Sequence, residues 1–390
     1  MKALRTGIVG VGNMGFAHAL CIYEGRVDGM CLSALCDINE AKLSTASEKF
    51  KVPVFKNFED MFSSRLLDAV IIAVPHPLHA VIAESAFRHG LHVMLEKPED
   101  VTVTAARRLN ETAKKSGKVF GIMFNQRTNE LFARARDIVR GGELGELKRT
   151  VWIVTNWYRT QSYYDSGDWR ATWSGEGGGV LLNQAPHNLD LWQWICGMPK
   201  SVTAFCDVAK YHNIEVEDDA AIFTRYENGA VGTFITTTGE FPGTNRLEIS
   251  GSLGKIVLED GKLKWWRLKT DEREFRFSYG GGTGDIPLEY EEFTQSAPES
   301  GHHGILQNFT NAVLKGDSLI AEGYEGINEL SISNAAYLSS WNGNREIQLP
   351  FDEAEFDSKL RLLADKDSLK GNNKSVQSAG GYKKRWQVRW

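Results

Sequence analysis

The stretch Gly7-Ile8-Val9-Gly10-Val11-Gly12-Asn13-Met14-Gly15 decides how the start of this chain folds. The apolar run Leu4 to Val9 ends within it, and Phe16 to Leu20 follows without a helix breaker. Three glycines in G-x-G-x-x-G spacing therefore lie between a strand and a helix. The first permits a tight turn, the second lets a pyrophosphate approach the backbone, and the third lets helix and strand pack closely. Free N–H groups at the start of the helix then hold the phosphates.

An acidic residue supports the interpretation of this stretch as a dinucleotide site. Asp37 lies 22 residues after Gly15 and follows the apolar segment Leu32 to Cys36. A carboxylate there accepts hydrogen bonds from an adenosine ribose and repels a 2′-phosphate, and no arginine follows it. The sequence thus predicts NAD rather than NADP. The alternative is a glycine-rich turn in another kind of α/β protein.

Length and composition limit the class of protein. The chain has 390 residues, too many for a single core, so two domains are expected. Its net charge of −5 predicts no attraction to nucleic acid or to an anionic membrane, and its apolar runs are too short for a membrane span. Its N-terminus does not resemble a secretory signal. The five cysteines form no C-x-x-C pair, which favours reduced core residues in a cytoplasmic protein.

The first third of the chain alternates short apolar strands with helical segments, which predicts a parallel sheet with helices on both faces. Strands are expected at 4–9, 32–36, 54–55, 68–74, 92–95 and 119–124. Ligands of such sheets bind beyond the carboxyl ends of the strands. The expected cofactor-binding residues are therefore Gly10, Gly12, Asn13, Met14, Asp37, Val74, Pro75, His76, His79, Glu96, Lys97 and Asn125.

The pattern changes after about residue 141. Longer alternating strands are expected at 148–157, 201–209, 220–227, 230–238, 246–250, 255–259 and 262–268, with helices at 303–315 and 324–341. This pattern predicts a second, α+β domain with an open, mostly antiparallel sheet. The α/β chain divides into a Rossmann NAD-binding domain at 1–125, a substrate domain at 126–350 and an extension at 351–390. The basic tail ends at Trp390, and docking or fraying of it are equally favoured.

Two further segments carry residues suited to chemistry. Glu96-Lys97-Pro98 follows a buried strand, where a lysine can stabilise the charge that develops on a carbinol oxygen during hydride loss. A lysine that simply emerges into solvent is the alternative. The segment from Gly177 to Asp190 contains His187 just after Pro186, at the start of a helix. A histidine can accept the hydroxyl proton, although a histidine without further evidence is more often a structural residue.

Together the glycine stretch, Glu96-Lys97-Pro98 and the segment ending in His187-Asn188-Leu189-Asp190 resemble the glucose–fructose oxidoreductase/inositol dehydrogenase (Gfo/Idh/MocA) family. The resemblance covers almost the whole chain. It implies NAD(P)-linked oxidation or reduction of a secondary alcohol of a sugar or polyol. It places Lys97 and His187 on the family's catalytic lysine and histidine. It also implies a homodimer or homotetramer formed through the open sheet.

One position departs from the family pattern. Four residues before the histidine the family often has an aspartate, but this chain has Asn183, although some sugar-oxidising relatives share the asparagine. An amide cannot hold the negative charge that stabilises an imidazolium. Either His187 works with a lowered pKa, or Asp190 or the substrate supplies the partner. Asn183 is therefore grouped with the catalytic residues.

An aromatic segment, Trp152 to Trp173, suits the apolar faces and polar rims of a sugar ring. Trp152 and Trp157 are expected to pack against the sheet, and the segment from Tyr163 to Arg170 is expected to bind substrate. This segment resembles relatives that oxidise free sugars or glycosides, which suggests carbon 3. The expected substrate residues are Arg127, Tyr163, Tyr164, Trp169, Arg170, Asn183 and His187, with His303 a weaker candidate. No metal site is expected, because the adjacent pair His302-His303 lacks an acidic partner.

The sequence thus predicts an NAD-dependent sugar or glycoside dehydrogenase of the cytoplasm. Two alternatives stay open. One is an enzyme that cleaves glycosides through transient oxidation by NAD, elimination and re-reduction. The other is a protein that senses NAD without catalysis.

Overall fold

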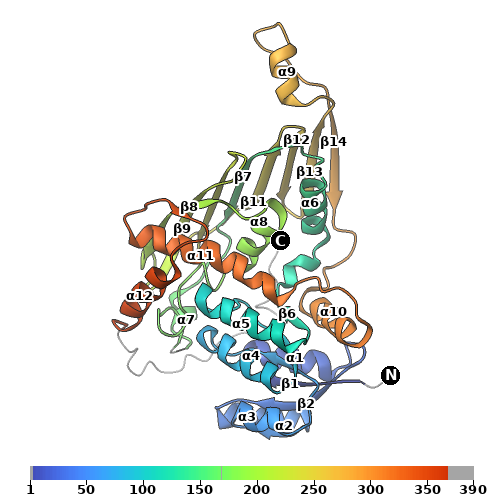
Figure 1. The fold of residues 1–390 in the computed structure, drawn as a ribbon, viewed down its shortest axis with the longest axis vertical. Coiled ribbons are helices and arrows are strands. Elements are labelled where there is room, and N and C mark those ends of the chain that lie inside the picture. The colour runs from blue at the N-terminus through green and yellow to red at the C-terminus, as the bar shows by residue number, and fades with distance from the viewer. Residues whose placement is uncertain (1–2, 168, 368–390) are drawn as a thin grey trace.

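The computed structural model describes residues 3–167 and 169–367, which form two β-sheets and the helices that cover them (Figure 1). The basic tail that ends at Trp390 lies outside the described residues. No helix in the described ranges combines the length and the apolar character needed to cross a bilayer.

The first sheet has six parallel strands in the order β3-β2-β1-β4-β5-β6. Their bounds are β1 Leu4–Val9, β2 Met30–Cys36, β3 Val54–Phe55, β4 Ala69–Ile72, β5 His92–Leu95 and β6 Phe120–Ile122. Every residue of β4 is buried, as expected for a strand covered on both faces. The strand order reverses between β1 and β4, the point at which sheets of this kind bind ligands in a crevice at the carboxyl ends of the strands. The predicted parallel sheet is confirmed.

Helices cover both faces of this sheet. They are α1 Asn13–Tyr23, α2 Glu40–Phe50, α3 Phe58–Ser63, α4 His79–Arg88 and α5 Val103–Ser116, with short 3₁₀ turns η1 His76–Leu78 and η2 Asn125–Thr128. Asn39 caps α2 as predicted, because its side chain accepts a hydrogen bond from the Lys42 backbone N–H at 3.1 Å.

The second sheet has nine strands in the order β14-β13-β12-β11-β7-β10-β9-β8-β15. Their bounds are β7 Leu147–Val154, β8 Ser201–Val208, β9 Glu217–Arg225, β10 Val231–Thr237, β11 Asn245–Gly251, β12 Gly254–Glu259, β13 Lys262–Leu268, β14 Leu288–Thr294 and β15 Ile347–Gln348. All neighbours are antiparallel except β7 and β10, which run parallel. The prediction of an open, mostly antiparallel sheet is confirmed.

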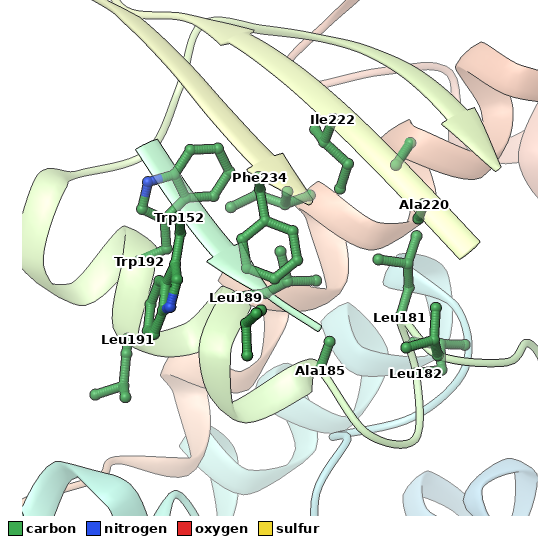
Figure 2. Close-up of a cluster of buried hydrophobic side chains, with 14 of the residues drawn as sticks. Trp152, Leu181, Leu182, Ala185, Leu189, Leu191, Trp192, Ala220, Ile222 and Phe234 are labelled. Carbon is green, nitrogen blue, oxygen red and sulfur yellow. The ribbon is translucent and has the colours of Figure 1, made fainter. Parts of the chain in front are cut away.

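One face of this sheet is covered by α6 Glu130–Arg140, α8 Pro186–Cys196 and α11 Gly326–Trp341 (Figure 1). Figure 2 shows how α8 is fixed there, with Leu189 and Trp192 pointing into a cluster of buried side chains from the strands. The Trp192 ring stacks on Phe234 with 5.5 Å between centroids. Because His187 lies on the first turn of α8, this packing also sets the position of His187.

Several elements differ from the sequence-based expectation. Helix α6 was not among the predicted helices, and α7 Gln161–Tyr164 makes the predicted substrate segment partly helical. Helix α9 Glu272–Ser278 projects beyond the end of the second sheet, and strand β14, which was not predicted, forms an edge of that sheet beside β13 (Figure 1). Helix α12 Glu353–Ala364 follows β15 and packs Phe356 against Trp341.

Helix α10 Gly301–Lys315 returns to the first sheet. Its side chains Ile305, Leu306 and Phe309 belong to the same buried cluster as Leu4 and Ile8 of β1. Just after it, the Ala321 carbonyl accepts a hydrogen bond from the Ile122 N–H of β6, and η3 Gly323–Glu325 leads into α11. The predicted domain at 126–350 thus contains a helix that completes the core of the first sheet.

Candidate active site

The three glycines at the end of β1 have the surroundings that a dinucleotide loop needs. Gly10 has a positive φ of +88°, and a Cβ there would lie 2.4 Å from the Ala73 carbonyl oxygen. A Cβ on Gly15 would lie 1.8 Å from the Gly10 carbonyl oxygen, so only glycine lets α1 start this close to the loop. Gly12 has no atom within 4 Å of such a Cβ, which leaves its backbone open to an approaching phosphate.

The residues beside this loop also fit NAD. Helix α1 begins after Gly12 with no side-chain cap, as expected where a helix N-terminus holds a pyrophosphate. Asp37 lies at the end of β2, where its carboxylate accepts from the Val11 N–H at 2.7 Å and from the Asn39 N–H at 2.8 Å. Beside it the Ile38 side chain is 90% exposed, an apolar surface suited to an adenine face. Sequence reasoning missed Ile38, although its place after the acid was visible.

Two of the expected cofactor residues hold loops together. The His79 ring places Nδ1 2.7 Å from the Pro98 carbonyl oxygen and Nε2 2.9 Å from that of Val74. It therefore ties the loop after β4 to the loop after β5. The His76 Nδ1 lies 3.0 Å from the Glu176 carbonyl oxygen and so joins the first sheet to the second half of the chain. Burial lowers the pKa of both histidines.

Glu96, at the end of β5, belongs to a buried acid–histidine cluster. Its Oε1 lies 2.7 Å from Nε2 of His18 on α1. Burial alone would raise its pKa, but the hydrogen bond and the charge of His18 lower it to about 2. The ring of His302 on α10 lies 5.8 Å from that of His18, and burial lowers the pKa of His302 to about 4. The residue that reaches the site is thus His302, whereas His303, named as a substrate candidate, is exposed.

Lys97 comes from the first half of the chain and reaches the second. Its Nζ donates a hydrogen bond to the Asn183 carbonyl oxygen at 2.7 Å. Burial lowers the pKa of Lys97, while the negative charges of Glu96 and Glu176, and that of Glu329 when it is ionised, oppose that shift. The ammonium has further N–H donors for a ligand oxygen.

His187 lies beside Lys97 on the first turn of α8. Its Nδ1 is buried and has no hydrogen-bond partner among residues 3–167 and 169–367. Burial lowers its pKa well below 6.5, and the positive charge of Lys97, with that of His302 when it is protonated, lowers it further. At neutral pH the imidazole is therefore uncharged and able to accept a proton.

Two buried amide oxygens share this lack of a partner. Asn125 Oδ1 at the end of β6 and Gln184 Oε1 just before α8 accept no hydrogen bond from the described residues. Buried polar atoms are almost always paired in proteins, so such acceptors fit a ligand rich in hydroxyl groups.

Tyr163 presents its hydroxyl to the same region. The oxygen accepts from Arg170 Nη1 at 2.9 Å, and from Asn183 Nδ2 and Gln184 Nε2 at 3.3 Å each. With its lone pairs used, the O–H proton is the part of this group left to bind a ligand. The Arg170 guanidinium also lies 4.7 Å from the ring centroids of Tyr163 and of Trp169.

Two other expected substrate residues have different roles in the structure. Tyr164 is buried in the core, where its hydroxyl lies 2.6 Å from Thr238 Oγ1. Arg127 is buried and bound through Nε and Nη2 to Asp190 at 2.8 and 2.6 Å, and through Nη1 to Glu325. Every nitrogen of this guanidinium is thus engaged within the protein. Tyr164 and Arg127 therefore have structural roles in place of the expected contact with substrate. Trp152 and Trp157 lie in the core as predicted.

The ion pair between Arg127 and Asp190 also decides whether Asp190 can be the acidic partner of His187. Asp190 is committed to Arg127 and to Gln193 Nε2 at 3.0 Å, so it does not serve as the acidic partner of His187. Within the described ranges, no group of three or more His, Cys, Asp and Glu side chains is arranged to hold a metal ion.

The models of two domains of one protein family match this chain. Residues 4–124 match "Oxidoreductase family, NAD-binding Rossmann fold", and residues 132–257 match "GFO/IDH/MocA C-terminal domain".

Individual relatives agree with this match. Myo-inositol 2-dehydrogenase of Thermotoga maritima is 24% identical over 340 residues, which cover 85% of this chain and 95% of that one. A glycosyl hydrolase family 109 protein of Shewanella baltica is 26% identical over 281 residues, 67% of this chain and 56% of that one. The crystal structure of the WlbA dehydrogenase from Bordetella pertussis with NADH and UDP-GlcNAcA is 26% identical, with a TM-score of 0.75 over 90% of this chain and 100% of that one.

Proposed function

The chain belongs to the Gfo/Idh/MocA family of NAD-binding oxidoreductases, and from this premise we propose that it transfers a hydride between a secondary alcohol of a sugar or glycoside and NAD. The observation that carries the proposal is the meeting of Lys97, from the end of β5, with the segment Asn183 to His187 that leads into α8. A base and a cationic hydrogen-bond donor thus adjoin the crevice of the first sheet.

The chain's own residues provide for the cofactor. The backbone from Gly10 to Gly15 and the first turn of α1 would hold the pyrophosphate. Asp37 would accept from the adenosine ribose, with Ile38 against the adenine. When bound, NAD supplies the hydride acceptor. The cluster of Glu96 and His18 fixes the strand end that carries Lys97.

Lys97 and His187 divide the work on the alcohol. His187, uncharged at neutral pH, takes the hydroxyl proton as the carbinol C–H bond gives up its hydride. Lys97 donates to the same oxygen and stabilises the negative charge that builds on it. The substrate loses one proton and one hydride and becomes a ketone. In the reverse direction His187 returns the proton.

Substrate recognition follows from the hydrogen bonds that the site leaves open. The Tyr163 hydroxyl can donate to a ring or hydroxyl oxygen, while Asn125 Oδ1 and Gln184 Oε1 can accept from hydroxyls. The Trp169 ring offers a flat aromatic face, 5.8 Å from the His76 ring. A polyhydroxylated ring matches this set of donors, acceptors and aromatic surface.

Purified protein with NAD and a panel of monosaccharides, polyols, sugar phosphates and glycosides tests this function. We expect NADH absorbance to grow with at least one of them, and mass spectrometry to find a product two hydrogens lighter. For the sugar that reacts, deuterium at carbon 3 should appear in the NADH if carbon 3 is oxidised, as we propose. A wild-type enzyme inert to the whole panel would contradict the proposed function.

A second candidate function rests on the family 109 relatives, which are named glycosyl hydrolases. In that case the ketone would acidify the neighbouring C–H bond, and loss of that proton would expel the glycosidic group. Water would add to the resulting double bond, and the same NADH would then reduce the ketone again. The panel distinguishes the two cases, because this enzyme would release the aglycone without any net build-up of NADH.

We also propose that the chain forms a homodimer or homotetramer through the uncovered face of the second sheet. On that face Phe205 of β8 is 58% exposed and Phe223 of β9 is 38% exposed, whereas their neighbours Ala204 and Ile222 are buried. Light scattering should give a mass of two or four chains, and Phe205→Glu should shift it toward one.

A further inference from the structure

Glu176 is a buried carboxylate just before the glycines that lead to α8. Its side chain is almost completely hidden from solvent, at 1% exposure. Oε2 accepts a hydrogen bond from the Ala171 N–H at 2.6 Å, and Oε1 accepts one from the Asn183 side-chain amide. Arg170 Nη1 lies 3.9 Å from the same oxygen. A buried acid held this firmly at a reaction site calls for an explanation beyond packing.

The contact with Glu176 fixes which way the Asn183 amide faces. An ionised carboxylate only accepts hydrogen bonds, so the NH₂ group of Asn183 must point to it. The same nitrogen also lies 3.3 Å from the Tyr163 hydroxyl. Both amide hydrogens are thereby used. The backbone oxygen of Asn183 meanwhile accepts from Lys97 Nζ at 2.7 Å, so one residue connects the lysine to the buried acid.

We propose that Glu176 is a positioning residue for the proposed oxidation, which supplies through Asn183 the negative charge that residue 183 itself lacks. Glu176 lies seven residues before position 183 in the chain. It acts through the Asn183 amide, one hydrogen bond farther from the substrate than an acid at position 183 would be. It fixes the Asn183 amide and balances the Lys97 ammonium. The inference rests on the proposed function for its meaning, although its effect on Lys97 is independent of any substrate.

The neighbours of Glu176 set the electrostatic balance. Arg170 from the preceding turn and Lys97 from the end of β5 are its cationic neighbours, and His76 contacts its backbone oxygen. Burial raises the pKa of Glu176, while Arg170, the Ala171 N–H and Asn183 oppose that shift. Of the two other acids that act on Lys97, Glu96 is bound to His18, and Glu329 is buried on α11.

A matched control lies in the same segment. Glu217 on β9 is also fully buried, and its carboxylate accepts from the N–H groups of Gly179 and Leu181 at 2.8 and 2.9 Å and from the Tyr337 hydroxyl at 2.7 Å. It supports the same glycine-rich segment from the other side of the chain. Glu176 is among the main groups that raise the pKa of Lys97, whereas the contacts of Glu217 are with Gly179, Leu181 and Tyr337.

The kinetic test compares Glu176→Gln with Glu217→Gln. Loss of a hydrogen bond to a charged group predicts a kcat about 10- to 100-fold lower for Glu176→Gln. Because the charge of Glu176 raises the Lys97 pKa, its removal should move the alkaline limb of the pH profile to lower pH. Glu217→Gln should leave that limb in place, whatever it does to stability. An unchanged kcat and an unchanged limb in Glu176→Gln would overturn the inference.

A charge-relocation pair makes the test independent of folding defects. Asn183→Asp alone places two carboxylates in contact, so we expect low activity. The double variant Glu176→Gln/Asn183→Asp returns the charge to position 183 and should exceed both single variants by about 10-fold or more. A double variant no better than the single variants would count against a role for charge.

A chemical measurement needs no substrate and so separates this inference from the proposed function. The pH dependence of Lys97 acetylation by acetic anhydride, followed by peptide mass spectrometry, reports the Lys97 pKa directly. We expect the midpoint to fall in Glu176→Gln and to stay in Glu217→Gln. If it falls while no sugar is oxidised by the wild type, Glu176 acts as inferred and the function is wrong. If it does not fall in an active enzyme, the function stands and the inference is wrong.

Discussion

Lys97 is the side chain on which the proposed chemistry depends most directly. Its Nζ is held at the Asn183 carbonyl, beside His187, and keeps N–H donors for the substrate oxygen. We expect Lys97→Met to lower kcat by about 10²- to 10³-fold, the effect of removing one donor from a developing oxyanion. NAD affinity, measured by calorimetry, should stay near that of the wild type. Retained turnover would remove Lys97 from the chemistry.

His187 should set the acid limb of activity. Burial, together with the charge of Lys97 and that of His302 when it is protonated, lowers its pKa well below 6.5, so the proton-accepting form persists at pH values where an exposed histidine is already charged. We therefore expect kcat/KM for oxidation to hold steady as pH falls through 6.5 and to decline only below it. A profile measured from pH 4.5 to 8 checks this. A limb at or above pH 6.5 would show that another group titrates.

Adjacent residues show how far sequence reasoning reaches at this scale. Tyr163 and Tyr164 read alike in the sequence, but α7 directs the first toward Asn183 and the second into the core against Thr238. Lys97 and His187 could be proposed as catalytic residues from the sequence because each lies in a local motif. Glu176 was missed because its significance depends on Asn183 and Lys97, which only the fold brings to it.

Two glycines in the β1–loop–α1 unit allow the effect of a mutation on stability to be separated from its effect on NAD binding. Replacing either glycine by alanine adds a single methyl group. In Gly15→Ala the new Cβ would lie 1.8 Å from the Gly10 carbonyl oxygen, so we expect a fall in melting temperature of several degrees or more. In Gly12→Ala the Cβ meets nothing within 4 Å, so stability should hold. The same methyl occupies the approach of the phosphate, so NAD affinity should fall about 10-fold or more. Thermal melts and calorimetry measure the two effects, and a destabilised Gly12→Ala would contradict this division.

Helix α8 depends on one large side chain for its place on the sheet. Trp192 is buried, stacks on Phe234, and donates from Nε1 to Thr150 Oγ1 at 2.9 Å. We expect Trp192→Ala to lower the free energy of unfolding by about 3–5 kcal/mol in urea titrations. Trp266→Ala is the control, because Trp266 is only half-buried on β13 and should cost less. Equal losses in the two variants would contradict this account of α8.

Helices and strands were predictable where one periodic pattern dominates. The fully buried strand β4 and helix α8 with its leading Pro186 follow directly from the sequence. Helix α6 was missed, although Leu131, Phe132, Ala135 and Ile138 form its buried face and Asn129 caps it. The sequence therefore carries both the apolar periodicity and the N-cap that indicate this helix. Strand β14 is different, because its residues are largely exposed and only pairing with β13 defines it.

The two halves of the molecule meet at acids that should make its stability depend on pH. Glu99, after β5, and Glu329, on α11, are fully buried, and burial raises the pKa of each well above 4.5. Stability from their neutral forms is complete below pH 4.5 and is lost as pH rises through the folded-state values. We expect Glu329→Gln to be more stable than the wild type at pH 8.5 by about 1 kcal/mol or more, with the difference shrinking toward pH 5. Urea unfolding at both pH values checks this, and a less stable variant at pH 8.5 would contradict it.

At this scale the sequence predicts the two sheets but not the contacts between distant segments. Arg127 was expected to meet substrate because it follows β6, yet it pairs with Asp190, 63 residues away, and with Glu325. Long-range pairs of this kind depend on how α8 and α11 pack, which periodicity does not specify. The glycine stretch and Asp37 predicted the NAD cofactor, the family resemblance supplied the oxidoreductase class, and the family match confirms both.

Helix α10 has a consequence for how the protein is made. Its side chains Ile305, Leu306 and Phe309 fill one face of the first sheet, and Ala321 binds the backbone of β6. During synthesis the ribosome therefore releases the six strands of the nucleotide-binding half long before the helix that completes it. Until residue 321 has left the exit tunnel, the apolar face of this half around Leu4 and Ile8 stays uncovered. A segment that is made late thus closes the part of the chain that is made first.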